Sequence, residues 1–460
     1  MPETNPTESQ ASTVSIRVSP QSYFTFLFLA TFFAAFILYL EYDLSAAVLV
    51  ILICPIVAVL MFTDRLVFDG KRIRRTGIVP RIWSWVYGMR DRLKLSDIEQ
   101  AETQALRALK RGGRVYYRYR TSIRGKGVTF SFASGNSDYI AMIKAILPSL
   151  NEDVLDNRSI EMRDYLADRR ETVLKAKNSN IPPADVLESS LSATRLGKKQ
   201  PAEDVTNILA NDEEADDLRR LANELRLSGS LWQAVETFRR AVRFKPKDGW
   251  LLFEFARCLQ SLAGSERDQR LERQAAAMMR LSERRAHGDA ELLARLGENY
   301  FQVGDWRRAG IVFQRALDSV GESFRALRGM AEIALREGKI AHVIHNFSAA
   351  NHHAETPSLR RWTQAEVEYF SRLNEDEEYM ELEVSRVSLL DSLTTAKRTV
   401  LKIAMLGFPT ILAGIVLEDS LIANIGWAVS GLSLSIWVSI MFMQKLLAPR
   451  IPFELTREDR

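Results

Sequence analysis

The five histidines are the side chains whose type and spacing come nearest to a metal site. His342 and His345 are one helical turn apart, as two ligands of one metal ion would be. No cysteine and no well-placed pair of carboxylates accompanies them, and they are better interpreted as surface side chains, like His287, His352 and His353. The sequence therefore predicts no metal site and no cofactor.

Phosphate-binding and nucleophilic chemistry also find no support in the sequence. The glycines of Gly112–Gly113 and Gly125–Gly127 lie between expected strands, where they suit hairpin turns. A phosphate-binding loop needs a strand, a glycine-rich loop and a helix in that order, and this order is missing. No motif presents a nucleophile beside a base, so we predict that the chain is not an enzyme.

A dense group of basic residues follows the first apolar region of the chain. It contains Arg107, Lys110, Arg111, Arg114, Arg118 and Arg120, followed by Arg124 and Lys126, with tyrosines interleaved. Each basic residue near an anionic lipid surface contributes about 1 kcal/mol to membrane binding, and basic strands with aromatic residues also suit nucleic acid. Of these partners we predict membrane lipid and not nucleic acid, with solvated strand faces as the alternative.

Composition agrees with a soluble middle between apolar ends. The 460 residues are 47% hydrophobic and 26% charged, and the net charge of +4 is mild for this length. Cys54 lies in an apolar stretch and Cys258 in an expected soluble helix, so these two cysteines are not expected to pair. The sequence predicts neither a disulfide framework nor a cysteine metal site.

Four uncharged or nearly uncharged stretches are long enough to cross a membrane as helices. They are Tyr23–Leu40, Leu44–Phe62, Val400–Leu417 and Leu421–Met443, and they form two hairpins over residues 21–63 and 400–445. Basic residues flank the open ends of both hairpins, whereas both short loops are acidic. The positive-inside rule then places both termini and the central region in the cytoplasm, with the protein in a bacterial inner membrane. No span has a charge at its centre, so no ion path is predicted.

Residues 64–151 show alternating patterns typical of strands. Two short strands surround an Asp69–Gly70 turn, further strands are expected at Arg92–Thr103, Arg114–Ile123 and Val128–Phe132, and an amphipathic helix follows Ser137. Antiparallel strands closed by a helix, directly after a membrane hairpin, resemble the bacterial pleckstrin-homology-like (PH-like) domain. An unrelated small α+β domain is the alternative.

The segments outside these regions are predicted from composition. Residues 1–20 are expected to be a disordered tail, residues 152–207 a charged helix and a flexible linker, and residues 446–460 a second tail. A linker of this kind would let the following domain move relative to the β-rich one. Residues 375–399 are expected to form a helix that runs into the third span.

A repeated pattern fills residues 208–374. Leu293–Tyr300 is followed by Gly304, Asp305 and Trp306, and related spacing recurs around Gly229 and, 34 residues after Gly304, around Gly338. This pattern resembles the tetratricopeptide repeat (TPR), in which helical hairpins stack into a solenoid. The resemblance implies about four repeats and a closing helix, with Gly264–Asp268 lengthening one turn. It also implies close helix approach at the small residues Ala222, Ala256, Gly297 and Ala331.

The resemblance nominates a binding surface, because in TPR proteins the first helix of each hairpin lines the groove. The residues so placed are Arg219, Asn223, Arg226, Trp250, Phe253, Arg257, Arg295, Arg325 and Arg328, together with Glu298 and Glu332. Arginine presents a planar fork to carboxylates, so an acidic peptide segment is the predicted partner. Arg219 and Asn223 resemble half of a carboxylate clamp, but Glu254 and Glu291 do not fit the rest of it. Solvated helix faces are the alternative.

The fold class predicted from these observations is mainly α: a TPR-like solenoid with a small β-rich domain, anchored by two transmembrane hairpins. The predicted function is a cytoplasm-facing membrane scaffold that binds protein partners through its repeats. A component of a transport or envelope-assembly complex, whose spans are themselves functional, is the alternative.

Overall fold

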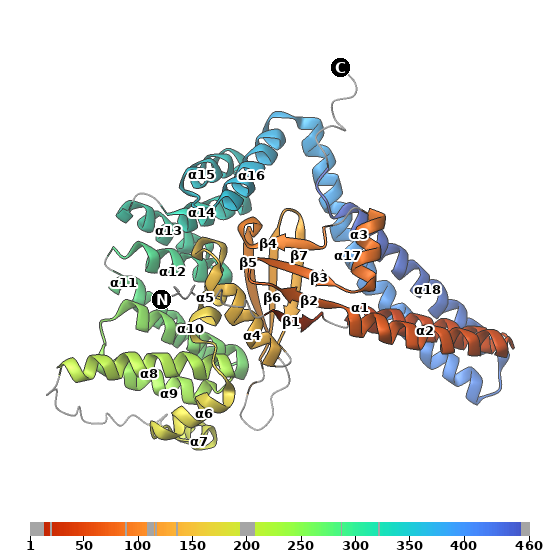
Figure 1. Cartoon of the computed structure of the whole chain (residues 1–460), viewed down its shortest axis with the longest axis horizontal. Coiled ribbons are helices and arrows are strands. Elements are labelled where there is room, and N and C mark those ends of the chain that lie inside the picture. The colour runs from red at the N-terminus through yellow and green to blue at the C-terminus, as the bar shows by residue number, and fades with distance from the viewer. Residues whose placement is uncertain are drawn as a thin grey trace, which may run out of the picture. The chain divides into compact units, whose positions relative to one another are not determined.

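The computed structural model of the chain describes residues 13–18, 21–87, 90–107, 115, 117–134, 137–193, 208–286, 288–320 and 323–451 (Figure 1). It divides into two compact units. The first comprises Met1–Leu27 and Cys54–Ala365, and the second comprises Phe28–Ile53 and Glu366–Arg460. Helices α1, α2 and α16 contribute residues to both units, which are described separately below.

The first unit contains two antiparallel sheets. One has the strand order β1 (Val14–Arg17), β2 (Arg65–Phe68), β3 (Arg72–Thr76) and β4 (Arg92–Lys94), and the other β5 (Gln100–Arg107), β6 (Tyr117–Gly125) and β7 (Val128–Ala133). The prediction of a disordered tail is wrong for residues 14–17, which pair with β2 so that buried Ile16 lies opposite buried Leu66. The strand expected at Arg92–Thr103 is broken by a turn of 3₁₀ helix, which sends β4 and β5 into different sheets.

Two helices belong to this β-rich part. Helix α3 (Ile78–Tyr87) follows β3, and α4 (Ser137–Ile146) follows β7. Helix α4 buries Tyr139, Met142, Ile143 and Ile146, which recur at helical spacing and join the core of the sheets. Helix α4 thus follows two antiparallel sheets along the chain, and β1 joins the first of them from before the apolar helices α1 and α2.

The stretch predicted as a helix and flexible linker is largely folded. It begins with the short turn η3 (Glu152–Val154) and continues as α5 (Asn157–Tyr165), α6 (Arg169–Asn178) and α7 (Ala184–Ala193). Helix α6 contacts α8 through the ion pair of Lys175 with Glu224 at 3.2 Å, and α7 contacts α9. The linker prediction is therefore wrong up to Ala193, because these helices pack on the repeats, and residues 194–207 lie outside the described residues.

Helical hairpins follow in the order expected from the repeat pattern. They are α8 (Ile208–Ser228) with α9 (Leu231–Phe244), α10 (Gly249–Glu266) with α11 (Gln269–Arg285), α12 (Ala290–Val303) with α13 (Trp306–Val320), and α14 (Phe324–Arg336) with α15 (Ile340–His353). Helix α16 (Pro357–Glu375) comes after the last hairpin. The architecture is thus mainly α, with TPR-like repeats.

Small residues let the helices of this array approach closely. Ala222, Ala256 and Ala331 are completely buried, and a Cβ atom added at Gly297 would lie 2.6 Å from the ring of Phe313. The extra residues at Gly264–Asp268 do not lengthen a turn as expected. They extend α10 to Glu266, and Arg267 then ends that helix in the left-handed conformation with a φ of 54°.

Among the described residues, four helices are long and apolar enough to span a membrane: α1 (Gln21–Tyr39), α2 (Asp43–Thr63), α17 (Glu377–Val416) and α18 (Ser420–Leu447). Helix α17 has 40 residues, or about 60 Å at 1.5 Å per residue, so its first half extends well beyond a hydrocarbon layer of about 30 Å. In the second unit α17 and α18 pack tightly through Gly407, Gly414 and Gly426, as is common between membrane helices.

Candidate functional site: an occupied repeat groove

The groove predicted from the repeats is occupied by a segment of the same chain. We call Glu152–Tyr165, which comprises η3 and α5, the groove segment. It contacts side chains of all four first helices, α8, α10, α12 and α14, and in Figure 1 α5 lies between these helices and the second sheet. The groove residues can therefore be described by their partners within the chain.

The centre of the groove holds a buried carboxylate. Glu161 of α5 forms ion pairs with Arg226 of α8 at 3.0 Å and with Arg257 of α10 at 2.7 Å, and each of the three side chains is 5% exposed. Burial alone would raise the pKa of Glu161, but the two guanidiniums outweigh it and hold that pKa below its usual value. Glu161 is thus ionised at neutral pH and supplies the only negative charge in direct contact with both arginines within the described residues.

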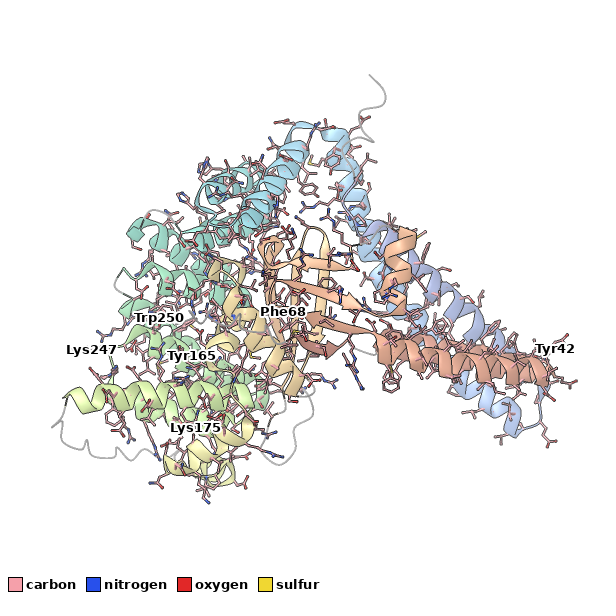
Figure 2. All side chains as sticks on the ribbon, viewed as in Figure 1. Tyr42, Phe68, Tyr165, Lys175, Lys247 and Trp250 are labelled. Carbon is pink, nitrogen blue, oxygen red and sulfur yellow. The ribbon has the colours of Figure 1, made fainter. Side chains whose placement is uncertain are left out.

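A second carboxylate lies within the groove itself. Arg219 donates two hydrogen bonds to Glu254, of 2.7 and 2.8 Å, and Asn223 donates one of 2.8 Å to the same group. Tyr165, at the end of the groove segment, also donates to Glu254 at 3.1 Å and is labelled in Figure 2. Glu254, which did not fit the carboxylate clamp, therefore neutralises the arginine that the clamp would have used.

The start of the groove segment lies against the later repeats. Arg295 of α12 pairs with Glu152 at 2.6 Å, and Arg325 of α14 donates to the carbonyl oxygens of Glu152 and Leu155. Asn157 donates its side-chain amide to the Arg295 carbonyl oxygen. The segment thus runs from the fourth repeat toward the first, opposite to the order of the repeats along the chain.

The remaining predicted groove residues contact one another or their neighbours. Phe253 is buried at 2% exposure in the repeat core, below the guanidinium of Arg257. Trp250, labelled in Figure 2, donates its indole N–H to Asp289 and lies 5.0 Å from the Arg295 guanidinium. Arg328 pairs with Glu332 on its own helix. Binding of an external partner at these residues stays a prediction.

The other side of the groove segment joins the β-rich part. Ile160 and Met162 are completely buried in the core formed by the sheets and α4. The Ser159 hydroxyl lies 2.8 Å from that of Thr103 in β5, and Tyr119 of β6 donates to the Leu227 carbonyl oxygen at the end of α8. The segment therefore fastens the sheets to the repeats with apolar contacts on one side and charged contacts on the other.

Sequence reasoning identified the arginines of this site but not their carboxylate partner. Glu161 falls in a stretch that reads as a charged, solvated helix, because Arg158, Arg163 and Asp164 surround it. The available signal was apolar: Ile160 and Met162 flank Glu161, and Val154 and Leu155 precede it. When apolar residues flank a carboxylate on a helix in this way, burial of the carboxylate together with the apolar residues can be predicted.

The predicted lipid-facing residues are only partly described. Arg118 and Arg120 are exposed on β6, on the opposite side of the strand from buried Tyr119. Arg107 ends β5, and Lys110, Arg111 and Arg114 lie outside the described residues. Among the described residues no group of three or more His, Cys, Asp or Glu side chains could hold a metal ion.

The cap of α5 carries a pH-dependent contribution to stability. Asp156 accepts hydrogen bonds from the backbone of Thr103 and Ser159, but burial, followed by repulsion from Glu298, raises its pKa from 3.8 to about 6. The folded state then keeps a proton that the unfolded state has lost, so the free energy of unfolding falls as pH rises from about 4 to about 6. We expect Asp156→Asn, which keeps the capping oxygen, to remove this decline and to be at least as stable as the wild type at pH 8.

Urea titrations of the full-length chain, followed by helical circular dichroism at several pH values, measure this effect. The Asp164→Asn variant is the control, because Asp164 pairs with Arg163 at the surface. An unchanged decline between pH 4 and pH 6 in Asp156→Asn would contradict the assignment to Asp156.

Comparison with known proteins finds only solved structures with low similarity scores. No protein-family model and no curated protein matches the sequence. PilF of Pseudomonas aeruginosa is 18% identical, over 47% of this chain and 90% of that chain, with a TM-score of 0.30. TTC0263, a TPR protein of Thermus thermophilus, is 17% identical over 45% and 98%, with a TM-score of 0.28. The Cut9–Hcn1 hetero-tetramer of APC/C gives 15% identity over 69% and 64%, with a TM-score of 0.29. At these scores the description of the repeats depends on the helix order and contacts of this chain.

Proposed function

We propose that the chain is an integral membrane scaffold that faces the cytoplasm of a bacterial cell and binds protein partners through its repeats. The four apolar helices serve as anchors, and the basic residues at their flanks set the orientation. The β-rich part is PH-like in this proposal, and Arg107, Lys110, Arg111, Arg114, Arg118 and Arg120 contact membrane lipid. No catalytic role is assigned to any part.

The observation that supports the partner class is the groove segment itself. Two of its carboxylates, nine residues apart at Glu152 and Glu161, are held by arginines of three different repeats. An acidic segment is thus the kind of ligand that this surface accepts. A partner segment with carboxylates at similar spacing would compete with the groove segment for Arg226, Arg257 and Arg295.

A labelled peptide with the sequence of residues 150–166 tests this proposal on the purified full-length chain. We expect saturable binding by fluorescence anisotropy that weakens as salt rises, because exposed ion pairs are screened over about 8–10 Å at physiological ionic strength. Reversing Arg226, Arg257 and Arg295 to glutamate should abolish it, because these side chains hold Glu152 and Glu161.

The matched control reverses three exposed arginines on second helices, Arg239, Arg284 and Arg307, which changes the net charge equally. This control should bind the peptide much like the wild type. If the wild type does not bind, or if the groove variant binds as well as the control, partner recognition lies elsewhere.

A further inference from the structure

Two arginines face each other across strands β1 and β2 without a carboxylate between them. Arg17 and Arg65 are direct partners in the antiparallel register, so their Cβ atoms lie about 4.5–5.5 Å apart. Among the described residues neither guanidinium lies within 4.0 Å of a carboxylate, whereas nearby Arg75 is fully engaged by Asp64. Like charges directly opposite each other are destabilising, unless an anion lies between them.

These arginines line a pocket with a mixed charge pattern. The pocket has a volume of about 200 Å³ and is lined by Ser15, Arg17, Arg65 and Asp138. Asp138 comes from the first turn of α4, which packs on β1, and within the described residues it forms no ion pair. Two cations and a hydroxyl thus stand beside one carboxylate in a space several times the roughly 30 Å³ of a water molecule.

The position of the pocket along the chain places it at the level of lipid headgroups. Arg17 precedes the start of α1 by four residues, and Arg65 follows the end of α2 by two. The Arg17 guanidinium also lies 5.2 Å from the centre of the Phe62 ring, in the last turn of α2. If α1 and α2 span the membrane as proposed above, the pocket opens in the interfacial layer that borders the hydrocarbon core.

Helix α3 gives independent support for this depth. Gly77, directly before α3, lies so close to the end of α2 that an added Cβ atom would be 3.1 Å from the Cα of Asp64. Ile78 and Ile82 follow on α3 at a spacing of four residues and are 45% and 53% exposed. Apolar side chains on one face of a short helix beside the end of a span are typical of a helix that lies in the membrane interface.

We propose that this pocket binds the headgroup of a phospholipid that carries an ammonium group. Arg17 and Arg65 hold the phosphodiester, because guanidinium groups bind phosphate oxygens through paired hydrogen bonds, and Ser15 donates a further one. Asp138 accepts the ammonium group. The inference rests on the proposed membrane anchoring, and it assigns lipid contact to a different sheet from the one that carries Arg118 and Arg120.

Native mass spectrometry of the detergent-solubilised full-length chain tests the proposal. The chain is offered equal amounts of phosphatidylethanolamine, phosphatidylglycerol and phosphatidylcholine with identical acyl chains. We expect the wild type to retain phosphatidylethanolamine about fivefold over phosphatidylcholine, which lacks N–H donors for Asp138. Arg17→Gln with Arg65→Gln should lose that retention, and Asp138→Asn should lose only the preference over phosphatidylcholine.

The matched control replaces Arg239 and Arg284, exposed on second helices of the repeats, by glutamine, which removes the same charge and should leave lipid retention unchanged. Circular dichroism checks that each variant is folded. If the double arginine variant does not fold, the single Arg65→Gln variant is used in its place. Equal retention of the three lipids by the wild type, or unchanged retention in the arginine variants, would overturn the proposal.

Two further measurements distinguish a lipid from a soluble ligand and test the membrane anchoring separately. Soluble phosphoethanolamine that displaces the retained lipid at millimolar concentration would assign the pocket to a soluble ligand and overturn the lipid proposal. Extraction of the wild type from membranes without detergent would contradict the anchoring itself. If instead the chain needs detergent for extraction but shows no lipid selectivity, only the pocket proposal fails.

Discussion

Replacement of Glu161 by glutamine is expected to lower the free energy of unfolding by about 3–5 kcal/mol, because two buried guanidiniums lose their shared counter-charge. Arg226 and Arg257 are each 5% exposed and meet the same oxygen of Glu161. Neither can turn to solvent without opening the contact between α5 and the repeats. The effect should reach the β-rich part as well, since Ile160 and Met162 are buried there on either side of Glu161.

The rate at which a thiol reagent labels Cys258 measures this loss in the full-length chain. Cys258 is completely buried in α10, and burial raises the pKa of its thiol to about 12, so labelling requires unfolding of the repeats. Replacing Cys54 by serine leaves Cys258 as the only thiol.

The control for this prediction is Glu291→Gln, which removes a 54% exposed carboxylate from Arg295 and should cost less than about 1 kcal/mol. If Cys258 were labelled at equal rates in the Glu161→Gln and Glu291→Gln variants under the same denaturing conditions, Glu161 would not be the buried counter-ion described above.

Replacement of Gly297 by leucine is expected to destabilise the repeats by about 1–3 kcal/mol or more through overpacking. A Cβ atom at position 297 would already lie 2.6 Å from the Phe313 ring, before the rest of the side chain is added. The same ring packs against Gly329 in the next hairpin. Displacement of Phe313 therefore disturbs two repeats at once, and the thermal midpoint of the whole array should fall.

The matched control is Gly310→Ala on α13. Its added Cβ would meet only Ile333, at 3.8 Å, and alanine favours a helix over glycine by roughly 0.5–1 kcal/mol. Gly310→Ala should thus raise the thermal midpoint slightly, whereas Gly297→Leu should lower it clearly. A Gly297→Leu chain that melts like the wild type would contradict the close approach of α12 and α13 at Gly297.

The repeats and the four apolar helices could be predicted because their signals are local and periodic. Gly229, Gly304 and Gly338 each end a first helix with a positive φ, and the same spacing of small residues recurs between them. The apolar stretches need only length and the absence of charge. In both cases residues that are close together along the chain determine the structure, so a single sequence is enough to predict it.

Strand β1 and the groove segment could not be predicted because their partners are distant along the chain. Val14–Arg17 is only four residues long and pairs with β2, which follows it after both apolar helices α1 and α2. Glu161 meets Arg226 and Arg257 through tertiary contacts 65 and 96 residues away. The sequence placed arginines along the first helices but carried no local sign that Glu152 and Glu161 of the same chain contact Arg226, Arg257 and Arg295.

Occupation of the groove by residues 152–165 is the central claim, and cysteine crosslinking tests it most directly. Asn157 and Glu298 are replaced by cysteine in a full-length chain whose Cys54 and Cys258 are replaced by serine and alanine. The Asn157 backbone N–H lies 3.3 Å from the Glu298 carboxylate, so a short bifunctional thiol reagent should join the two introduced cysteines rapidly in isolated membranes. Pairing Asn157→Cys with Arg307→Cys, on a second helix, should give no such product. Rapid crosslinking of only the first pair is the predicted result, and equal yields from both pairs, or none from the first, would contradict an occupied groove.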